Sequence, residues 1–113
     1  MGTSTAYADE VKRVRDVGVD TVDIAQATGT ATATVTAWAR ATRQPSGEHR
    51  DRLLELVALV ERLSRVMDPP YVPVWLHKPL SALDDRRPLE ALSKGQYRQV
   101  SRLVAELENE SFS

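Results

Sequence analysis

The stretch TVDIAQATGTATATVTAWARA, residues 21–41, decides how the N-terminal half of this chain folds. Apolar residues recur at helical spacing on both sides of Gly29, and glycine readily adopts the left-handed conformation that ends a helix. The stretch therefore predicts two short helices joined by a tight turn, with Thr21 capping the first and Thr32 capping the second, which runs to about Ala41. Two helices joined in this way form a helix-turn-helix, in which the second helix can enter the major groove of DNA.

The outward face of the second helix carries side chains that suit DNA. Threonine can bond to phosphate or to a base edge, and arginine is the common partner of guanine. The candidate DNA-binding residues are Thr32, Thr36, Arg40 and Arg43. An ordinary helical bundle could show the same pattern, with Trp38 as a core anchor. Residues 1–50 contain six basic and six acidic side chains, so we expect only weak non-specific affinity for DNA.

A further helix is expected before this stretch. One apolar face indicates a helix of about three turns that ends near Gly18, with Ser4 and Thr5 as candidate caps. That face consists of Tyr7, Val11 and Val14.

The longest helix is expected after the stretch, from about Glu48 to Met67, because apolar positions repeat there at helical spacing. Its length of roughly 28 Å is enough to connect two subdomains. Leu53, Val57 and Val60 on this helix could form a dimer seam, or they could pack within the core of the monomer.

Three prolines within DPPYVP, residues 68–73, interrupt the helical pattern. Proline lacks a backbone N–H and disfavours a helical conformation at the residue before it, so a linker or a broken turn is expected there. We therefore divide the chain into residues 1–68, the helix-turn-helix region with the long helix, and residues 69–113. In the second part, a short segment at residues 74–76 precedes a helix from Pro88 to Gly95.

The last helix has one apolar face and an acidic end. The apolar face consists of Tyr97, Val100, Leu103, Val104 and Leu107. We expect Leu103 to be buried, and we expect the terminal sequence ELENESFS, residues 106–113, to fray. Because strand patterns are nearly absent, the predicted fold class is all-α: an N-terminal helix-turn-helix bundle, a long connecting helix and a small C-terminal helical module.

The composition excludes several classes of protein. The chain has 113 residues and no cysteine, which rules out disulfide scaffolds, thiolate metal sites and cysteine nucleophiles. Its histidines, His49 and His77, lack the spacing of a metal site, and no phosphate loop or nucleophile motif is present, so we predict no catalytic residue, metal site or cofactor. His77 is expected to be a surface or interface donor. No signal peptide or membrane span is recognisable, so we expect a cytoplasmic protein without a membrane partner.

The C-terminal sequence VWLHKPLSALDDRRPLEALSKGQYRQVSRLVAELE, residues 74–108, contains the most specific pattern of the chain. Its markers are Trp75, Leu76, Pro79, Leu80, Pro88, Leu89, Leu92, Gly95, Val100 and Leu103. In this order and spacing they resemble the toxin-binding domain of the Xre/MbcA/ParS antitoxin family, over about residues 70–113. The helix-turn-helix resembles the Xre-like half of the same family, so the two resemblances together span nearly the whole chain.

The resemblance implies an antitoxin of a type II toxin–antitoxin system that is not itself an enzyme. Its partner would be a RES-domain toxin that destroys NAD, which the antitoxin neutralises by direct binding, with its C-terminal segment blocking the NAD pocket. Operator DNA is a further expected partner, for autoregulation of transcription, and we expect a homodimer within a larger toxin–antitoxin complex. The alternative is a stand-alone helix-turn-helix transcriptional regulator with a C-terminal dimerisation module.

The residues expected to bind the toxin combine this resemblance with their own chemistry. A pocket for the NAD pyrophosphate should be rich in arginine and backbone donors, which an acidic tail can occupy, and Phe112 could insert as an apolar anchor. The alternative is a disordered, solubilising tail. Trp75 and Tyr97 are either core residues or exposed anchors of the interface, and we expect Trp75 to be mostly core. The predicted toxin-binding residues are Trp75, Lys78, Arg98, Arg102, Glu106, Glu110, Phe112 and Ser113.

Overall fold

The computed structural model describes residues 2–111, and the side chains of residues 6–111. Within this part of the chain the regular structure is helical, apart from an isolated bridge between Leu80 and Arg86. In chain order the elements are α1 (Gly2–Val17), α2 (Thr21–Thr28), α3 (Thr32–Ala39), α4 (Gly47–Val66), α5 (Tyr71–Leu76), the short 3-10 helix η1 (Ser81–Leu83), α6 (Pro88–Ser93) and α7 (Tyr97–Ser111). The predicted all-α class is confirmed.

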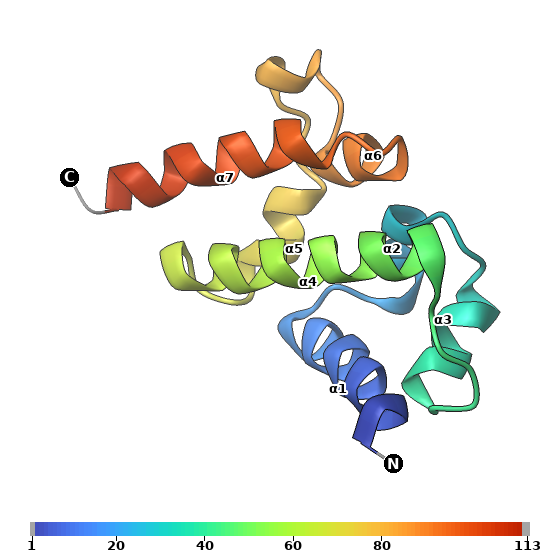
Figure 1. The fold of residues 1–113 in the computed structure, drawn as a ribbon. Coiled ribbons are helices and arrows are strands. Elements are labelled where there is room, and N and C mark those ends of the chain that lie inside the picture. Colours follow the sequence, from blue (N-terminus) through green and yellow to red (C-terminus); the bar gives the residue numbers. More distant parts are fainter. Residues whose placement is uncertain (1, 112–113) are drawn as a thin grey trace.

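Helix α4 runs through the middle of the molecule (Figure 1). Helices α1 and α2 pack against it from the N-terminal part of the chain, and α5 and α7 pack against it from the C-terminal part. Helix α2 also packs directly on α6. The residues that α4 buries recur every three or four positions, with Leu59 added: Leu53, Leu56, Val57, Leu59, Val60 and Leu63. Both parts of the chain therefore pack their buried residues against the same helix, α4.

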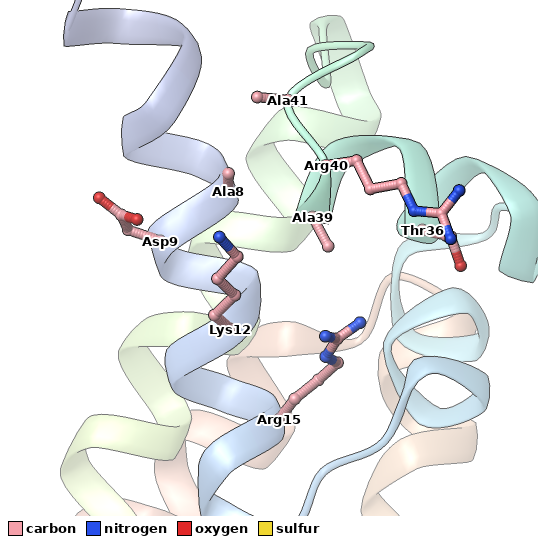
Figure 2. A pocket seen from close by; sticks show the side chains of 8 residues that line it. All are labelled: Ala8, Asp9, Lys12, Arg15, Thr36, Ala39, Arg40 and Ala41. Atoms are coloured by element: carbon pink, nitrogen blue, oxygen red, sulfur yellow. The ribbon is translucent and has the colours of Figure 1, made fainter.

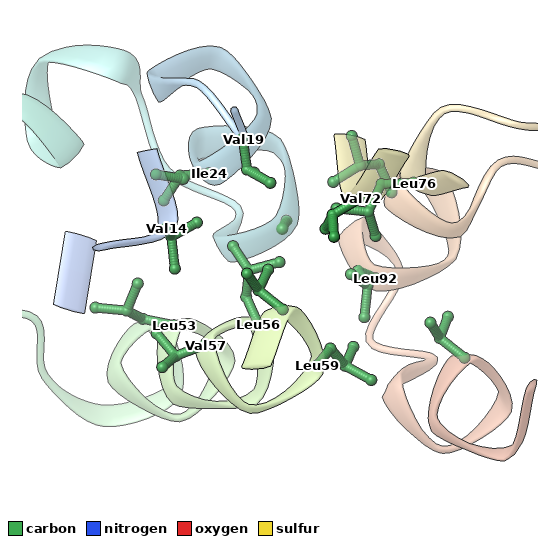
Figure 3. Packing of buried hydrophobic residues seen from close by; sticks show 14 of the residues in the cluster. Val14, Val19, Ile24, Leu53, Leu56, Val57, Leu59, Val72, Leu76 and Leu92 are labelled. Carbon is green, nitrogen blue, oxygen red and sulfur yellow. The ribbon is translucent and has the colours of Figure 1, made fainter. Parts of the chain in front are cut away.

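The buried hydrophobic cluster crosses the position where we divide the sequence. Figure 3 shows Leu53 and Val57 of α4 on the side of Val14, whereas Leu59 lies on the side of Leu92. The residues that we left open between a dimer seam and a monomer core, Leu53, Val57 and Val60, are buried within one chain. Their burial is explained by core packing without a second copy.

The helix-turn-helix forms as predicted, but Asp20 and not Thr21 caps α2. The Asp20 Oδ1 atom accepts a hydrogen bond from the backbone N–H of Asp23 at 3.0 Å, and Thr21 is already the first residue of the helix. Gly29 ends α2 with a φ of 73°, and the N–H of the next residue donates to the carbonyl of Ala25.

The start and the end of α3 both differ from the prediction. Thr32 is the first residue of the helix and not its N-cap. The N-cap is Ala31, which has no side-chain oxygen that could accept a capping hydrogen bond. The helix ends at Ala39 because Ala41 adopts a φ of 59°, which a right-handed helix cannot continue. Trp38 is buried in the core, as an anchor of either a helix-turn-helix or a bundle would be.

Helix α1 is longer than the predicted three turns. It begins at Gly2 and has 16 residues, so Ser4 and Thr5 lie inside it and the prediction that they cap it is wrong. Val11 and Val14 of the predicted apolar face are buried, and Tyr7 is partly buried against the same cluster.

The proline-rich stretch contains a helix, α5, in place of the predicted linker or broken turn. Pro70 is the N-cap of α5, and Pro73 lies in its first turn. The first backbone N–H groups of a helix have no partner within the helix, so a proline there removes no hydrogen bond.

Helix α7 continues to Ser111, so the predicted fraying of the acidic end is wrong for the residues that the structure describes. Its buried residues are Val100 and Val104, whereas Leu103, which we expect to be buried, is only half-buried. The predicted apolar face of α7 packs on the core, since Tyr97, Leu103 and Leu107 are partly buried against the same cluster as Val100 and Val104. Leu103 lies at the edge of this face, where it lines a hollow.

Candidate functional site

Three shallow hollows adjoin one another on the C-terminal part of the molecule, with volumes of about 200, 360 and 220 Å³. Trp75 lines the first and the third, and Leu103 and Glu106 line the first and the second. We call the continuous surface around these hollows, formed by α5, η1 and α7, the α5/α7 surface. The predicted toxin-binding residues on it are Trp75, Lys78, Arg102, Glu106 and Glu110.

The amphipathic pattern of α7 explains why its charged side chains lie on this surface. Arg98, Arg102, Glu106 and Glu110 follow one another at a spacing of four residues, which places them on one exposed stripe of the helix. Val100 and Val104 are fully buried on another side and fix the rotation of the helix. The stripe is basic near the start of α7 and acidic near its end. Arg98 is exposed on the stripe but lies outside the three hollows.

Helix α5 contributes an apolar half to the α5/α7 surface. Trp75 is half-buried: part of the ring packs against the core, and the rest lines two of the hollows. Beside it, Tyr71 is 61% exposed and Val74 is 60% exposed, and the sequence analysis missed both. Val74 and Trp75 follow Tyr71 by three and four residues, which was a usable signal of a shared helical face. Large apolar side chains exposed together are typical of protein-binding surfaces.

Glu108, in the acidic C-terminal stretch, is held by a hydrogen-bonded ion pair with α4. Arg62 of α4 donates hydrogen bonds to its Oε1 atom from Nη2 at 2.7 Å and from Nε at 3.2 Å, and also donates from Nη1 to Ser101 Oγ at 2.7 Å. The hydrogen bond from Arg62 holds the pKa of Glu108 below its usual value of 4.5, and it raises the pKa of Arg62. This network joins α7 to α4. The sequence analysis missed Arg62 because 46 residues separate the two partners.

Replacing Glu108 with Gln should lower the free energy of unfolding near pH 7, and the loss should become smaller in acid. The pKa of Glu108 is lower in the folded chain than its usual value of 4.5, so the ionised carboxylate stabilises the fold above that value. This stabilisation disappears as the pH falls below 4.5 and passes through the folded-state pKa. Urea unfolding of both proteins between about pH 7 and about pH 3 measures the difference.

Glu106→Gln is the matched control, because Glu106 is exposed and makes no ion pair within residues 6–111. It should change the free energy of unfolding by less than about 0.5 kcal/mol at every pH. An equal loss in the two variants would contradict an anchoring role for the contact between Arg62 and Glu108.

The last predicted toxin-binding residues, Phe112 and Ser113, lie outside the described residues. The alternative of a disordered tail does not hold for the part of the tail that the structure describes, because residues 106–111 are helical.

The predicted DNA-binding residues lie on the outward side of α3 and on the loop after it. Thr32, Arg40 and Arg43 are exposed, and Thr36 is half-buried. Thr36 and Arg40 line a groove of about 580 Å³ between α3 and α1. Figure 2 shows that α1 contributes two further cationic side chains to this groove, Lys12 and Arg15. The sequence analysis missed them, although a spacing of three residues on the polar side of α1 indicated a shared face.

His77 is exposed at the surface, as predicted, and it also makes contacts within the chain. Its Nε2 atom lies 3.0 Å from Oδ2 of Asp23 in α2, and its Nδ1 atom lies 3.5 Å from Nη1 of Arg87. Asp23 is buried, so His77 supplies the partner that a buried carboxylate requires. Across the described residues, there is no group of three or more His, Asp or Glu side chains that could hold a metal ion.

Comparison with known proteins decides the family. No family model matches the chain. The probable mycobacterial cidal antitoxin Rv3188 of Mycobacterium tuberculosis is 34% identical to it over 90 residues, which cover 80% of this chain and 76% of that protein. This chain belongs to the mycobacterial cidal antitoxin family. Other members, the mycobacterial cidal antitoxins MbcA of Mycobacterium bovis and of Mycobacterium tuberculosis, are each 21% identical to it over 104 residues, or 92% of both chains.

A solved structure shows that this antitoxin family shares the fold. The crystal structure of the M. tuberculosis MbcT–MbcA toxin–antitoxin complex contains a chain that superposes on this antitoxin with a TM-score of 0.79, covering 91% of this chain and 94% of that one at 21% identity. The family assignment supports the antitoxin of the sequence analysis over its alternative, the stand-alone transcriptional regulator. No helix among residues 2–111 is both long enough and apolar enough to cross a membrane.

Proposed function

We propose that this antitoxin neutralises a RES-domain toxin that degrades NAD, by binding it through the α5/α7 surface. The observation that supports this proposal is that Trp75 of α5, Lys78 just after α5 and Arg102 of α7 border one continuous set of hollows. Tryptophan, tyrosine and arginine are the residue types that most often anchor protein interfaces. The relative MbcA is crystallised in a complex with the toxin MbcT, which is consistent with a toxin as the occupant.

The C-terminal segment is proposed to block the NAD pocket of the toxin. The exposed stripe of α7 becomes acidic toward its end, where Glu106 and Glu110 border the first hollow. Carboxylates there can form charge-assisted hydrogen bonds with the arginine and backbone donors that a pyrophosphate pocket requires. Because Glu106 and Glu110 line the first hollow, we assign this role to them and to the segment 111–113, with Phe112 as the apolar anchor.

Operator DNA is the second partner in this proposal, bound through α3. The helix-turn-helix places Thr32 and Arg40 on an exposed side of α3, from which they can reach base edges in a major groove. A homodimer would present two copies of α3 about 34 Å apart, the spacing of successive major grooves on one face of a duplex. Under this proposal residues 1–68 bind DNA and residues 69–113 bind the toxin.

Removing residues 111–113 should weaken inhibition strongly while leaving the fold intact. A chain that ends at Glu110 keeps the buried Val104 and the contact between Arg62 and Glu108, so it should fold as the full chain does. The assay is NAD consumption by the RES toxin encoded beside this antitoxin, titrated with each chain. Loss of one anchor worth about 2 kcal/mol raises the concentration needed for inhibition about 30-fold.

The same assay tests the α5/α7 surface with a pair of charge reversals. Arg102→Glu lies on this surface and should weaken inhibition, whereas Lys94→Glu, exposed elsewhere, should not. Full inhibition by the chain ending at Glu110 would show that the segment 111–113 does not block the pocket. Undiminished NAD consumption in the presence of the full chain would show that the toxin is of another kind.

A further inference from the structure

The groove between α1 and α3 has a floor of small residues and walls of long cationic side chains. Ala8, Ala39 and Ala41 form the floor. In Figure 2, Arg15 extends from α1 toward α3, Lys12 lies along α1 toward Ala8, and Arg40 extends along α3 toward Thr36. The volume of about 580 Å³ makes it the largest of the hollows described above. Its shape is open, so it suits an extended chain more than an enclosed small molecule.

The cations of this groove have no carboxylate partners among residues 6–111. Lys12, Arg15 and Arg40 make no ion pair there, whereas Arg13, on the other side of α1, pairs with Glu10 at 3.4 Å and Glu61 at 3.3 Å. The groove has one acidic lining residue, Asp9, whose carboxylate is turned away from α3 in Figure 2. Three unpaired cations around a hollow create a local positive potential, although the chain as a whole has a net charge of −1.

We propose that this groove binds the phosphodiester backbone of double-stranded DNA, with Lys12 and Arg15 as phosphate contacts. The proposal rests on the DNA-binding part of the proposed function, and extends it from α3 to α1. Arg40 and Thr36 belong both to the groove and to the outward side of α3. A backbone strand in the groove would therefore lie beside the bases that α3 reaches. Phosphate contacts of this kind set the register of a protein on the duplex and do not depend on sequence.

The lining of the groove favours DNA over the other polyanions. It contains no aromatic or large aliphatic side chain that could anchor a protein interface. Double-stranded RNA has a major groove too deep and narrow for a protein helix, so α3 could not sit beside its backbone in the same way. Duplex DNA satisfies both the cationic groove and the neighbouring helix.

The double variant Lys12→Gln/Arg15→Gln tests the proposal against a variant of equal charge, Arg65→Gln/Lys94→Gln, whose exposed cations lie outside the groove. The probes are two duplexes of about three helical turns, one from the DNA upstream of this antitoxin's own gene and one of scrambled sequence. Fluorescence anisotropy at several salt concentrations gives the affinity and its salt dependence. We expect the groove variant to lose about 60-fold in affinity for both duplexes at 0.1 M salt and its salt slope to fall by about 1.8, because each phosphate contact contributes about 0.9 to the slope.

Arg40→Ala separates this proposal from DNA binding by α3. It should weaken binding of the upstream duplex more than that of the scrambled one, because a base contact carries sequence information. If Arg40→Ala behaves in this way while the groove variant retains the affinity and salt slope of the unmodified protein, DNA binding stands and the groove proposal is overturned. If the unmodified protein does not bind either duplex, the DNA-binding part of the proposed function is wrong, and the groove proposal is wrong with it.

Two further outcomes would assign the groove to another ligand. Equal affinity for the matching RNA duplex would overturn the assignment to DNA. If the groove variant no longer inhibited the toxin, the ligand of the groove would be an acidic surface of the toxin and not DNA. We expect neither, and we expect the groove variant to keep the circular dichroism melt of the unmodified protein, because Lys12 and Arg15 are both exposed.

Discussion

Replacing Val104 with Asp is expected to detach α7 from the molecule and to abolish toxin inhibition. Val104 is fully buried in the hydrophobic cluster, and among residues 6–111 no cationic side chain is buried there to compensate a carboxylate. An unpaired charge in such a position costs about 3–5 kcal/mol, a large part of the stability of a small domain. Urea unfolding followed by circular dichroism measures the loss.

Leu103→Asp is the matched control for this prediction. Leu103 precedes Val104 by one residue but is half-buried at the edge of two hollows, beside Arg102 and Gln99. A carboxylate there remains hydrated, so the expected loss is below about 1.5 kcal/mol. Equal losses at the two positions, or a larger loss at Leu103, would contradict the difference in burial between Val104 and Leu103.

Leu59→Ala is expected to destabilise both parts of the chain together by about 2–5 kcal/mol, the usual cost of truncating a fully buried leucine. Leu59 lies on the side of α4 that packs against the C-terminal part of the chain. It belongs to a buried cluster that also includes residues of the N-terminal part. The two tryptophans report on the two parts separately, because Trp38 belongs to α3 and Trp75 to α5. Urea unfolding by fluorescence, in Trp38→Phe and Trp75→Phe backgrounds, follows each part alone.

Leu54→Ala serves as its control, since Leu54 is on the same helix but 43% exposed. It should cost less than about 1 kcal/mol by either tryptophan. If Leu59→Ala shifted the transition reported by Trp75 and left that reported by Trp38 unchanged, the two parts would be independent folding units and α4 would not couple them.

The helices were predictable from the sequence because their apolar residues recur at helical spacing and are buried by packing. The burial of Leu53, Leu56 and Val60 on α4 follows directly from that spacing. Caps were less predictable: Asp20 and Thr21 are both competent N-cap residues, and only the backbone conformation selects Asp20. Helix α5 was missed because the three prolines indicated a break, and two of them in fact lie at positions where a helix tolerates proline.

The candidate site was predictable where its residues share one helix. The exposed stripe that contains Arg102 and Glu106 follows from the periodicity of α7. The contacts of Arg62 with Glu108 and of Asp23 with His77 join residues that are far apart in the sequence, and a single sequence does not specify such pairs. The groove beside α3 was missed for the same reason, since it exists only where α1 and α3 meet.

The sharing of α4 by both parts of the molecule restricts how such antitoxins can be recombined. Consider a hybrid that joins residues 1–68 of one relative to residues 69–113 of another. Its α2 and α4 would come from one parent, and the helices that they pack against, α6 and α7, from the other. His77, the hydrogen-bond partner of the buried Asp23, would also come from the other parent. Under the proposed function, changes of partner specificity would arise through point substitutions on the outer faces of α3 and α7, because these leave the shared interior unchanged.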